Sequence, residues 1–233
     1  MENTEYLKRL AGEAAVGFVA SGMVLGLGHG STVIWALRLI AAKIARHELR
    51  DILGVPCSSI VAAEAEKLGI PLTTLEEHPV VDLTIDGADE VDSRLDLIKG
   101  RGGALLREKI VAQASRREII VVDGAKVTGV LGRRSPVPVE LIPFGYRCQT
   151  AYLSGLGARR VTLRLGPDDL PRRSDEGNYL ADCDFGPIDD PAGLAARLDR
   201  RAGIVAHGLF LGLTTDLLVA DPTGIHHHSR DAA

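Results

Sequence analysis

The feature that most constrains the fold is a repeated alternation of short apolar runs with longer segments of helical periodicity. The apolar runs predict strands at 23–27, 52–56, 70–72, 80–85, 95–98 and 119–122. Between them, apolar residues recur every three or four positions, which is the spacing of one helix face. Helices are therefore expected at 6–19, 33–50, 59–68 and 104–114. Alternating strands and helices imply an α/β fold with a mostly parallel sheet that is covered by helices on both faces.

The pattern changes after Gly132 to strand, helix, strand, strand, helix, strand. This order suits a ferredoxin-like α+β domain over 133–210 that is inserted into a larger domain, made of 1–132 and 211–233. Pro136 and Pro138 make the first of its segments a poor central strand. Further strands are expected at 161–165 and 179–183, a helix at 192–198, and a strand at 216–220 where the chain returns to the larger domain.

Charge and hydropathy exclude several kinds of partner. Lys and Arg number 27 against 31 Asp and Glu, a net charge of -4, so the chain has no overall field to gather a nucleic acid. No apolar run is long enough to span a bilayer, and the first ten residues lack the pattern of a signal peptide. We therefore expect a cytoplasmic protein with no membrane partner.

The cysteines and the histidine run give no sign of a metal or disulfide framework. Cys57, Cys148 and Cys183 are odd in number and far apart, which favours reduced core thiols. The run His226, His227 and His228 is expected to be a frayed polar terminus without a role, although such a run can bind a metal adventitiously.

A glycine turn lies between the first predicted strand and the following helix. It reads Gly28-His29-Gly30-Ser31-Thr32, and it offers backbone amides, two hydroxyls and a helix start, which together can hold a phosphate. The turn lacks the lysine of a Walker loop. Taken alone it is weak evidence, and a purely structural turn remains open.

A second loop concentrates negative charge, with Asp86, Asp89, Glu90 and Asp92 inside seven residues. Such carboxylates must be exposed, protonated or matched by cations. A calcium loop is disfavoured because Ala88 occupies the third position, where a ligand is required. A solvated acidic turn remains an alternative.

A third loop, 99–103, leads to Glu108 near the start of a predicted helix. Lys99 stands at a strand end, where its positive charge can balance the acidic loop or stabilise a developing oxyanion. Glu108 can serve as a base, but it can also be a solvent-facing residue that pairs with its helix neighbours.

Together these loops resemble the type A family of ribose-5-phosphate isomerases. Five segments match in chain order and cover almost the whole chain, and the acidic segment and the lysine loop carry most of the weight. They read GLGHGST at 26–32, DGADE at 86–90, KGRGGALLREK at 99–109, DGAK at 123–126 and PVPVE at 136–140.

The resemblance implies an aldose–ketose isomerase of the non-oxidative pentose phosphate pathway. It implies interconversion of D-ribose 5-phosphate and D-ribulose 5-phosphate without metal or organic cofactor, in a Rossmann-like domain with a small α+β insert, as a homodimer or homotetramer. By the same resemblance, Glu108 is the proton acceptor, and Asp86, Asp89 and Lys99 bind the sugar and help to open its ring. The implied substrate site comprises His29, Gly30, Ser31, Thr32, Asp86, Gly87, Ala88, Asp89, Lys99, Gly100, Arg101, Gly102 and Lys126.

The chemistry of carbonyl transfer fits these residues. A proton leaves C2 and returns at C1, so one base that also acts as an acid is enough, and Glu108 suits that task. The enediolate intermediate requires positive charge or hydrogen-bond donors near its oxygens, and Lys99 is the cation of the matched loop.

Two positions depart from the family pattern. His29 stands where a threonine is usual, and we expect backbone amides to hold the phosphate while the ring faces water. Arg101 replaces a glycine, so either the backbone tolerates a Cβ or the loop is strained by about 1 kcal/mol. A preference for a related sugar phosphate is therefore an alternative.

A non-catalytic sugar-phosphate sensor is the alternative from another class, because effector domains of some repressors resemble this fold. Such proteins carry an N-terminal DNA-binding helix pair. Here the matched segment GLGHGST begins at Gly26, which leaves no room for that pair.

Overall fold

The computed structural model describes residues 2–230, which divide into two compact units. The first unit comprises the described residues up to Ala88, Arg107–Lys126 and the described residues from Leu213 onward. The second comprises Asp89–Leu106 and Val127–Gly212. The insert expected at 133–210 lies within the second unit, and its bounds as a folding domain stay a prediction.

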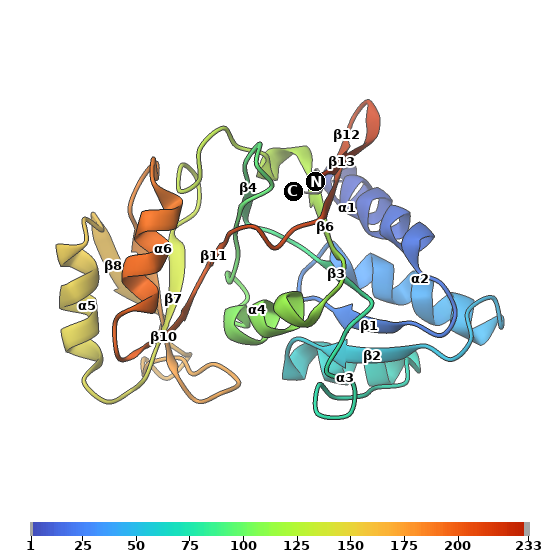
Figure 1. Ribbon diagram of the computed structural model, residues 1–233, viewed down its shortest axis with the longest axis horizontal. Helices are drawn as coiled ribbons and strands as arrows, with labels where there is room; N and C mark the ends of the chain where they lie inside the picture. The colour runs from blue at the N-terminus through green and yellow to red at the C-terminus, as the bar shows by residue number, and fades with distance from the viewer. Residues whose placement is uncertain (1, 231–233) are drawn as a thin grey trace. The chain divides into compact units, whose positions relative to one another are not determined.

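The first unit is built on a six-stranded sheet with the order β13-β12-β6-β3-β1-β2 (Figure 1). Every neighbouring pair is parallel except β12 and β13, so the α/β expectation with a mostly parallel sheet is confirmed. The strands are β1 (Val24–Leu27), β2 (Leu53–Pro56), β3 (Leu83–Asp86), β6 (Glu118–Asp123), β12 (Asp216–Asp221) and β13 (Gly224–Ser229). All six residues of β6 are buried, which explains why this central strand reads as a continuous apolar run.

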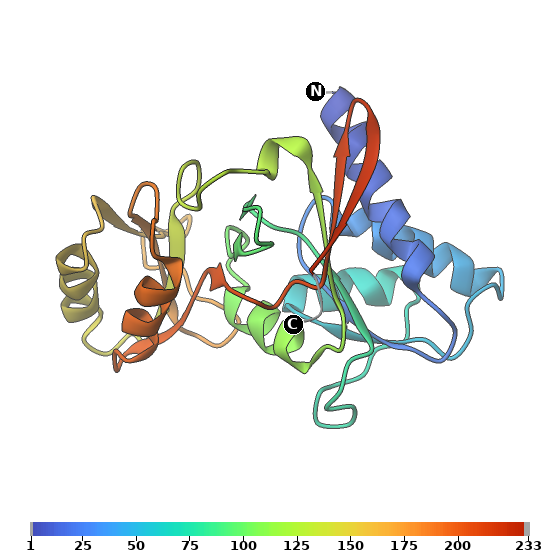
Figure 2. The ribbon, with the colours of Figure 1, turned by 45° about the horizontal axis from the view of Figure 1, so that its top comes forward.

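Helices cover both faces of this sheet, with α1 and α2 on one face and α3 and α4 on the other (Figure 1). They are α1 (Glu2–Ala15), which continues into the 3₁₀ turn η1 (Val16–Phe18), α2 (Val33–Ala45), α3 (Ser59–Leu68) and α4 (Leu105–Ala114). The ends of α3 follow local rules: Ser58 Oγ accepts a hydrogen bond from Val61 N (3.1 Å), and Gly69 ends the helix with φ 74°. Figure 2 shows α1 alongside the β12–β13 hairpin, although they come from opposite ends of the sequence.

The strand order creates a switch point at the carboxyl end of β1. From β1 the chain crosses through α2 to β2 on one side, while β3 pairs with β1 on the other side. The register pairs Leu27 with Ile85, so the residues that follow β1 and the last residue of β3 lie next to each other. In parallel α/β sheets, ligands bind at this kind of crevice.

The second unit contains a four-stranded antiparallel sheet with the order β10-β7-β9-β8. Its elements are β7 (Val137–Leu141), α5 (Tyr146–Gly155), β8 (Arg160–Leu163), β9 (Tyr179–Asp184), α6 (Pro191–Asp199) and β10 (Ile204–His207). This is the ferredoxin-like βαββαβ order expected from the sequence. A separate three-stranded sheet joins β4 (Glu90–Val91), β5 (Leu97–Ile98) and β11 (Leu209–Phe210).

Two local expectations are wrong. The strand expected at 70–72 shrinks to one isolated bridge between Leu72 and Gly54. The proline segment forms β7, a central strand, because Pro138 lies beyond the last register position with β10, and its carbonyl accepts a hydrogen bond from Gly208 N (2.7 Å). A proline at the end of that ladder loses no hydrogen bond to β10.

The expected frayed terminus is also wrong, because His226–His228 lie within β13. This strand pairs with β12 along its whole length, from Asp221 opposite Gly224 to Asp216 opposite Ser229. Its histidines are exposed, as suits an edge strand with one open side. No helix in residues 2–230 is long and apolar enough to cross a membrane.

Candidate active site

The glycine turn after β1 is fastened to the end of β3. Gly28 N donates to Ile85 O (3.0 Å), and His29 N donates to Asp86 Oδ1 (3.0 Å). A Cβ at position 28 would lie 2.4 Å from the Asp86 carboxylate, so only glycine permits this close approach. The turn and the Asp86 carboxylate therefore form one rigid feature at the switch point.

The His29 ring is half-buried, which corrects the expectation that it faces water. Its Nδ1 lies 3.1 Å from Oγ of Ser58, the residue that caps α3. The ring therefore links the glycine turn to the start of α3.

A pocket of about 360 Å³ opens beside this turn. The turn supplies one wall, and side chains of α2 and α3 supply the others. Its lining residues are Gly28, His29, Gly30, Ser31, Ile34, Leu37, Ile60, Val61 and Glu64. Thr32 stands at the N-cap position of α2 and is buried, and Gly30 O accepts the hydrogen bond of Ile34 N (3.2 Å). A helix start beside a pocket is a suitable place for an anion.

Glu108 lies in the first turn of α4 and is only 5% exposed, so the alternative of a solvent-facing helix residue is wrong. Asp86, the last residue of β3, is 1% exposed. The side chains of these two residues converge with that of Cys57, and their ligand atoms lie within 4.8 Å of one another. Cys57 directly follows β2, and its N donates to Leu27 O (3.0 Å).

Sequence reasoning assigned Cys57 only to the core. Its burial agrees with that, but its neighbours do not belong to an inert core. The signal that was available is its position: Cys57 follows a parallel strand at the same edge of the sheet as Asp86.

Other predicted residues of the first unit lie at this edge of the sheet. Gly87 N donates to Asp86 Oδ1 (2.7 Å), and Gly87 and Ala88 are half-buried after β3. Lys126 is half-buried in the short 3₁₀ turn that follows β6. That turn is shaped by a hydrogen bond from Ala125 N to Asp123 Oδ1 (3.0 Å).

The second unit holds the remaining predicted residues in two adjacent segments, Asp89 before β4 and 99–102 after β5. Asp89 N donates to Ile98 O (2.8 Å), and Asp89 Oδ2 accepts a hydrogen bond from Arg101 N (3.0 Å). Lys99, at the end of β5, is 2% exposed, and its Nζ lies 5.6 Å from the centre of the Phe210 ring. The structure therefore brings Asp89, Lys99 and Arg101 together.

The glycine-rich segment after β5 is braced by arginines of the same unit. Arg164 Nη1 donates to Gly100 O (2.9 Å) and Arg101 O (3.1 Å), and Arg172 Nη2 donates to Gly102 O (3.1 Å). Gly100 has φ 108°, whereas Arg101 is not among the described non-glycine residues with positive φ. The backbone therefore accepts a side chain at Arg101 without strain.

Two of the four clustered acids serve the structure, and both are buried, so a solvated acidic turn is wrong for them. Glu90 is 0% exposed, and its carboxylate accepts hydrogen bonds from the backbone N–H groups of Gly132, Arg134 and Ser135. Asp92 Oδ1 accepts hydrogen bonds from Arg94 N (2.9 Å) and Asp96 N (3.0 Å). Asp86 and Asp89 are left as the candidates for ligand contact.

Comparisons with known proteins identify the family of this chain. Residues 53–224 match the family model of ribose 5-phosphate isomerase A (phosphoriboisomerase A). Ribose-5-phosphate isomerase A of Chloroflexus aurantiacus is 55% identical over 225 residues, which are 97% of this chain and 94% of that protein.

Solved structures show the same relation. A D-ribose-5-phosphate isomerase in complex with phospho-erythronic acid superposes with a TM-score of 0.95 at 36% identity, covering 98% of this chain and 100% of that one. Ribose 5-phosphate isomerase from Plasmodium falciparum gives a TM-score of 0.94 at 37% identity, with the same coverage. The chain therefore belongs to the ribose 5-phosphate isomerase A family.

Proposed function

We propose that Glu108 is the general base with which this chain, an aldose–ketose isomerase, interconverts D-ribose 5-phosphate and D-ribulose 5-phosphate. The observation that carries this proposal is the buried carboxylate of Glu108 in the first turn of α4, beside that of Asp86. The relatives reported above are named as isomerases, so the alternative of a non-catalytic sensor has no support.

The reaction needs one group that removes and returns a proton at carbon. In the open-chain aldose, Glu108 takes the proton from C2, and the C2–H electrons form the C1–C2 double bond of an enediolate. The same carboxyl group then returns its proton to C1, while the hydroxyl proton of O2 is transferred to O1. Burial of the Glu108 side chain keeps bulk water away from the acquired proton.

Lys99 is proposed to stabilise the negative oxygens of the enediolate. Its side chain is buried, and an ammonium group acts more strongly on an oxyanion in a region of low dielectric constant than in water. Asp86 and Asp89 are assigned to binding the sugar hydroxyls and to ring opening. Asp86 suits this role because backbone N–H groups fix one of its oxygens.

The phosphate is proposed to bind at the turn His29–Thr32, with Lys126 as a further contact. The support is the helix start beside a pocket, where backbone N–H groups attract an anion without any net positive charge on the protein. A relative at 36% identity is described in complex with phospho-erythronic acid, a phosphorylated sugar acid. Gly87, Ala88 and Gly100–Gly102 are assigned to the sugar itself.

The substitution Glu108→Gln tests the role of the base. A general base contributes about 10²–10⁴ to the rate, so turnover should fall by roughly 10²-fold or more while folding and sugar-phosphate binding persist. Glu66→Gln, an exposed glutamate on α3, is the matched control and should leave turnover unchanged. Near-normal turnover in Glu108→Gln would remove Glu108 from this role.

The named substrate is tested by deuterium exchange at C2, followed by NMR across several aldose phosphates. We expect exchange in ribose 5-phosphate. If ribose 5-phosphate does not exchange while a different aldose phosphate does, the assigned substrate is wrong although the reaction class stands. The same measurement on His29→Thr and Arg101→Gly shows whether these two residues shift the substrate preference.

We propose that the enzyme acts in the cytoplasm as a homodimer or homotetramer. All three cysteines lie in the described part of the chain and none of them forms a disulfide, as suits a reducing compartment. Phe144 is 88% exposed, which suits burial against a second copy. Light scattering of the purified protein tests the assembly, and a monomer at working concentration would contradict it.

A further inference from the structure

The thiol of Cys57 is a group that the isomerase reaction does not require, yet it lies beside the reacting carboxylates. One ligand atom from each of Cys57, Asp86 and Glu108 falls within 4.8 Å of the other two. All three residues belong to the first unit, and they are 1%, 1% and 5% exposed. This is a compact set of one sulfur donor and two oxygen donors.

The three donors come from different elements, and each is held in place. Cys57 is tied to the end of β1 by the hydrogen bond from its N to Leu27 O (3.0 Å). Asp86 is held by the N–H groups of His29 and Gly87. Glu108 lies in the first turn of α4 and is buried. Separately anchored donors form a site before any ligand arrives, which lowers the cost of binding.

The donor set selects a particular class of ion. Thiolate is a soft ligand that suits Zn²⁺ and related ions, whereas Mg²⁺ takes oxygen ligands in an octahedral arrangement. Zinc binds sulfur at about 2.3 Å and carboxylate oxygen at about 2.0–2.2 Å, so donors on one tetrahedral ion lie about 3–4 Å apart. Bringing the three ligand atoms from their present spacing, within 4.8 Å, to this distance requires side-chain shifts of about 1 Å at most. Zinc sites with three protein ligands complete the tetrahedron with water or a substrate atom.

We propose that Cys57, Asp86 and Glu108 form a binding site for a soft divalent cation such as Zn²⁺ or Cd²⁺, and that the bound ion inhibits isomerisation. Inhibition rests on the proposed function, because it follows from the ion occupying the carboxylate that takes the C2 proton. Binding releases the thiol proton of Cys57 to solvent, and no redox step is involved.

Titration of the purified, metal-free protein with Cd²⁺ tests the site directly. A thiolate–cadmium bond adds a charge-transfer absorption in the ultraviolet, and we expect this band to saturate at one ion per chain. Cys57→Ser should abolish the band and weaken binding by more than the roughly 10–100-fold that loss of an outer-shell partner costs. Cys148→Ser removes an exposed thiol and is the matched control, which should keep the band.

Turnover measured in the same titration tests inhibition. Activity should fall with the midpoint of the absorption band and return after addition of a chelator. Cys57→Ser should remain active at cadmium concentrations that inhibit the wild type, and Cys57→Ala serves the same purpose if the serine variant does not fold.

The outcomes separate the two proposals. Absence of the band, or a band that persists in Cys57→Ser, overturns the cation site whatever Glu108 does. A band that depends on Cys57 but leaves turnover unchanged overturns the three-residue site and the inhibition, because the ion then does not occupy Glu108. The role of Glu108 is decided separately by the turnover of Glu108→Gln.

Discussion

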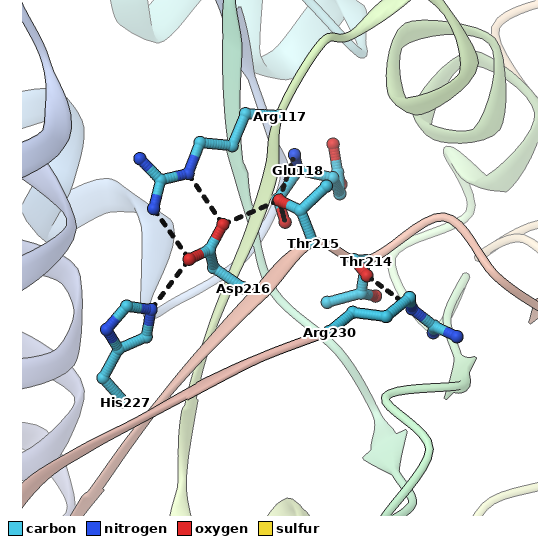
Figure 3. A network of polar contacts seen from close by, with 7 residues as sticks. All are labelled: Arg117, Glu118, Thr214, Thr215, Asp216, His227 and Arg230. Atoms are coloured by element: carbon cyan, nitrogen blue, oxygen red, sulfur yellow. Dashed lines mark hydrogen bonds and ion pairs between the residues drawn. The ribbon is translucent and has the colours of Figure 1, made fainter. Parts of the chain in front are cut away.

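Two buried aspartates lie at opposite ends of the parallel strands of one sheet and are held in different ways. Asp216, the first residue of β12, accepts two hydrogen bonds of 2.7 Å from the Arg117 guanidinium and one of 2.8 Å from Thr215 Oγ1, and His227 Nε2 lies 2.7 Å away (Figure 3). Asp86, the last residue of β3, has one oxygen fixed by two backbone N–H groups. The first is held by a cationic side chain and the second by the main chain.

The difference shows how the hydrogen-bond partners of a buried carboxylate suit it either to a structural role or to contact with a ligand. Burial raises the pKa of Asp216, but hydrogen bonds from Arg117, Thr215 and His227 outweigh burial and lower that pKa to about 2. Figure 3 shows the surrounding contacts, in which Glu118 N donates to Thr215 Oγ1 (3.0 Å) and Arg230 Nε donates to Thr214 O (2.9 Å). Asp216 therefore fastens the C-terminal hairpin, whereas Asp86 presents a carboxylate beside Glu108.

The largest expected contrast is between Asp86→Asn and Asp216→Asn in turnover. Asparagine keeps an oxygen for the N–H groups of His29 and Gly87 but removes the charge. Turnover of Asp86→Asn should fall by roughly 10²-fold, the scale of effect that misplacing a substrate produces, with little change in melting temperature. Asp216→Asn should leave the kinetic constants unchanged. Equal kinetic losses in both variants would contradict the assignment of Asp86 to binding and Asp216 to structure.

Gly28→Ala changes the packing beside Asp86 without changing any charge. The added Cβ would meet the Asp86 carboxylate at 2.4 Å and Ile85 O at 2.5 Å, so the turn or the end of β3 must move. Overpacking of this kind costs about 1–3 kcal/mol, and we expect a loss of activity larger than the loss of stability suggests. Denaturant unfolding and steady-state kinetics check both parts. Gly17→Ala, where a Cβ meets nothing within 4 Å, is the control.

Asp216→Asn should reduce the free energy of unfolding by about 1–2 kcal/mol at neutral pH, a modest value because the Arg117 side chain is 38% exposed and regains water. The pKa of about 2 lies below the ordinary value of 3.8, so this stabilisation is present above pH 3.8. It is lost as the pH falls through the folded-state value. The wild type should therefore lose more stability than the variant between about pH 5 and pH 2.

Parallel curves for the two proteins in acid would show that Asp216 is not held by charge. Thermal unfolding followed by circular dichroism across this pH range is the measurement, and the Arg117→Gln variant should behave as Asp216→Asn does.

Much of the sheet edge that carries the candidate site follows from the sequence, because buried parallel strands appear in it as apolar runs. The run at 119–122 predicted β6, and the glycine turn after 23–27 predicted the start of α2. The position of Glu108 was predicted by resemblance, but its burial was not, since a glutamate between Arg107 and Lys109 also suits an exposed helix face.

Features that depend on contacts distant in sequence were missed. Strand β13 carries three histidines and no apolar alternation, because one side of an edge strand faces solvent and pairing with β12 alone defines it. Glu90 and Asp92 looked like parts of an exposed acidic loop, since their backbone partners lie in turns that have no sequence signature. Cys57 was missed because only the folded sheet brings the end of β2 near α4.

The packing of α1 against β12 has a consequence for synthesis on the ribosome. The apolar side of the first helix, which includes Leu7, Leu10 and Ala14, packs into a core that includes Leu218 and Ala220, near the end of the chain. The long segment Val127–Gly212 of the other unit is translated in between. During translation that unit is complete first. The N-terminal helix can already pack against α2 and β6, but the part of its apolar side that meets β12 stays uncovered until the last strands emerge. Nascent chains stalled before β12 should therefore bind chaperones through the N-terminal helix, whereas the released full-length chain should not.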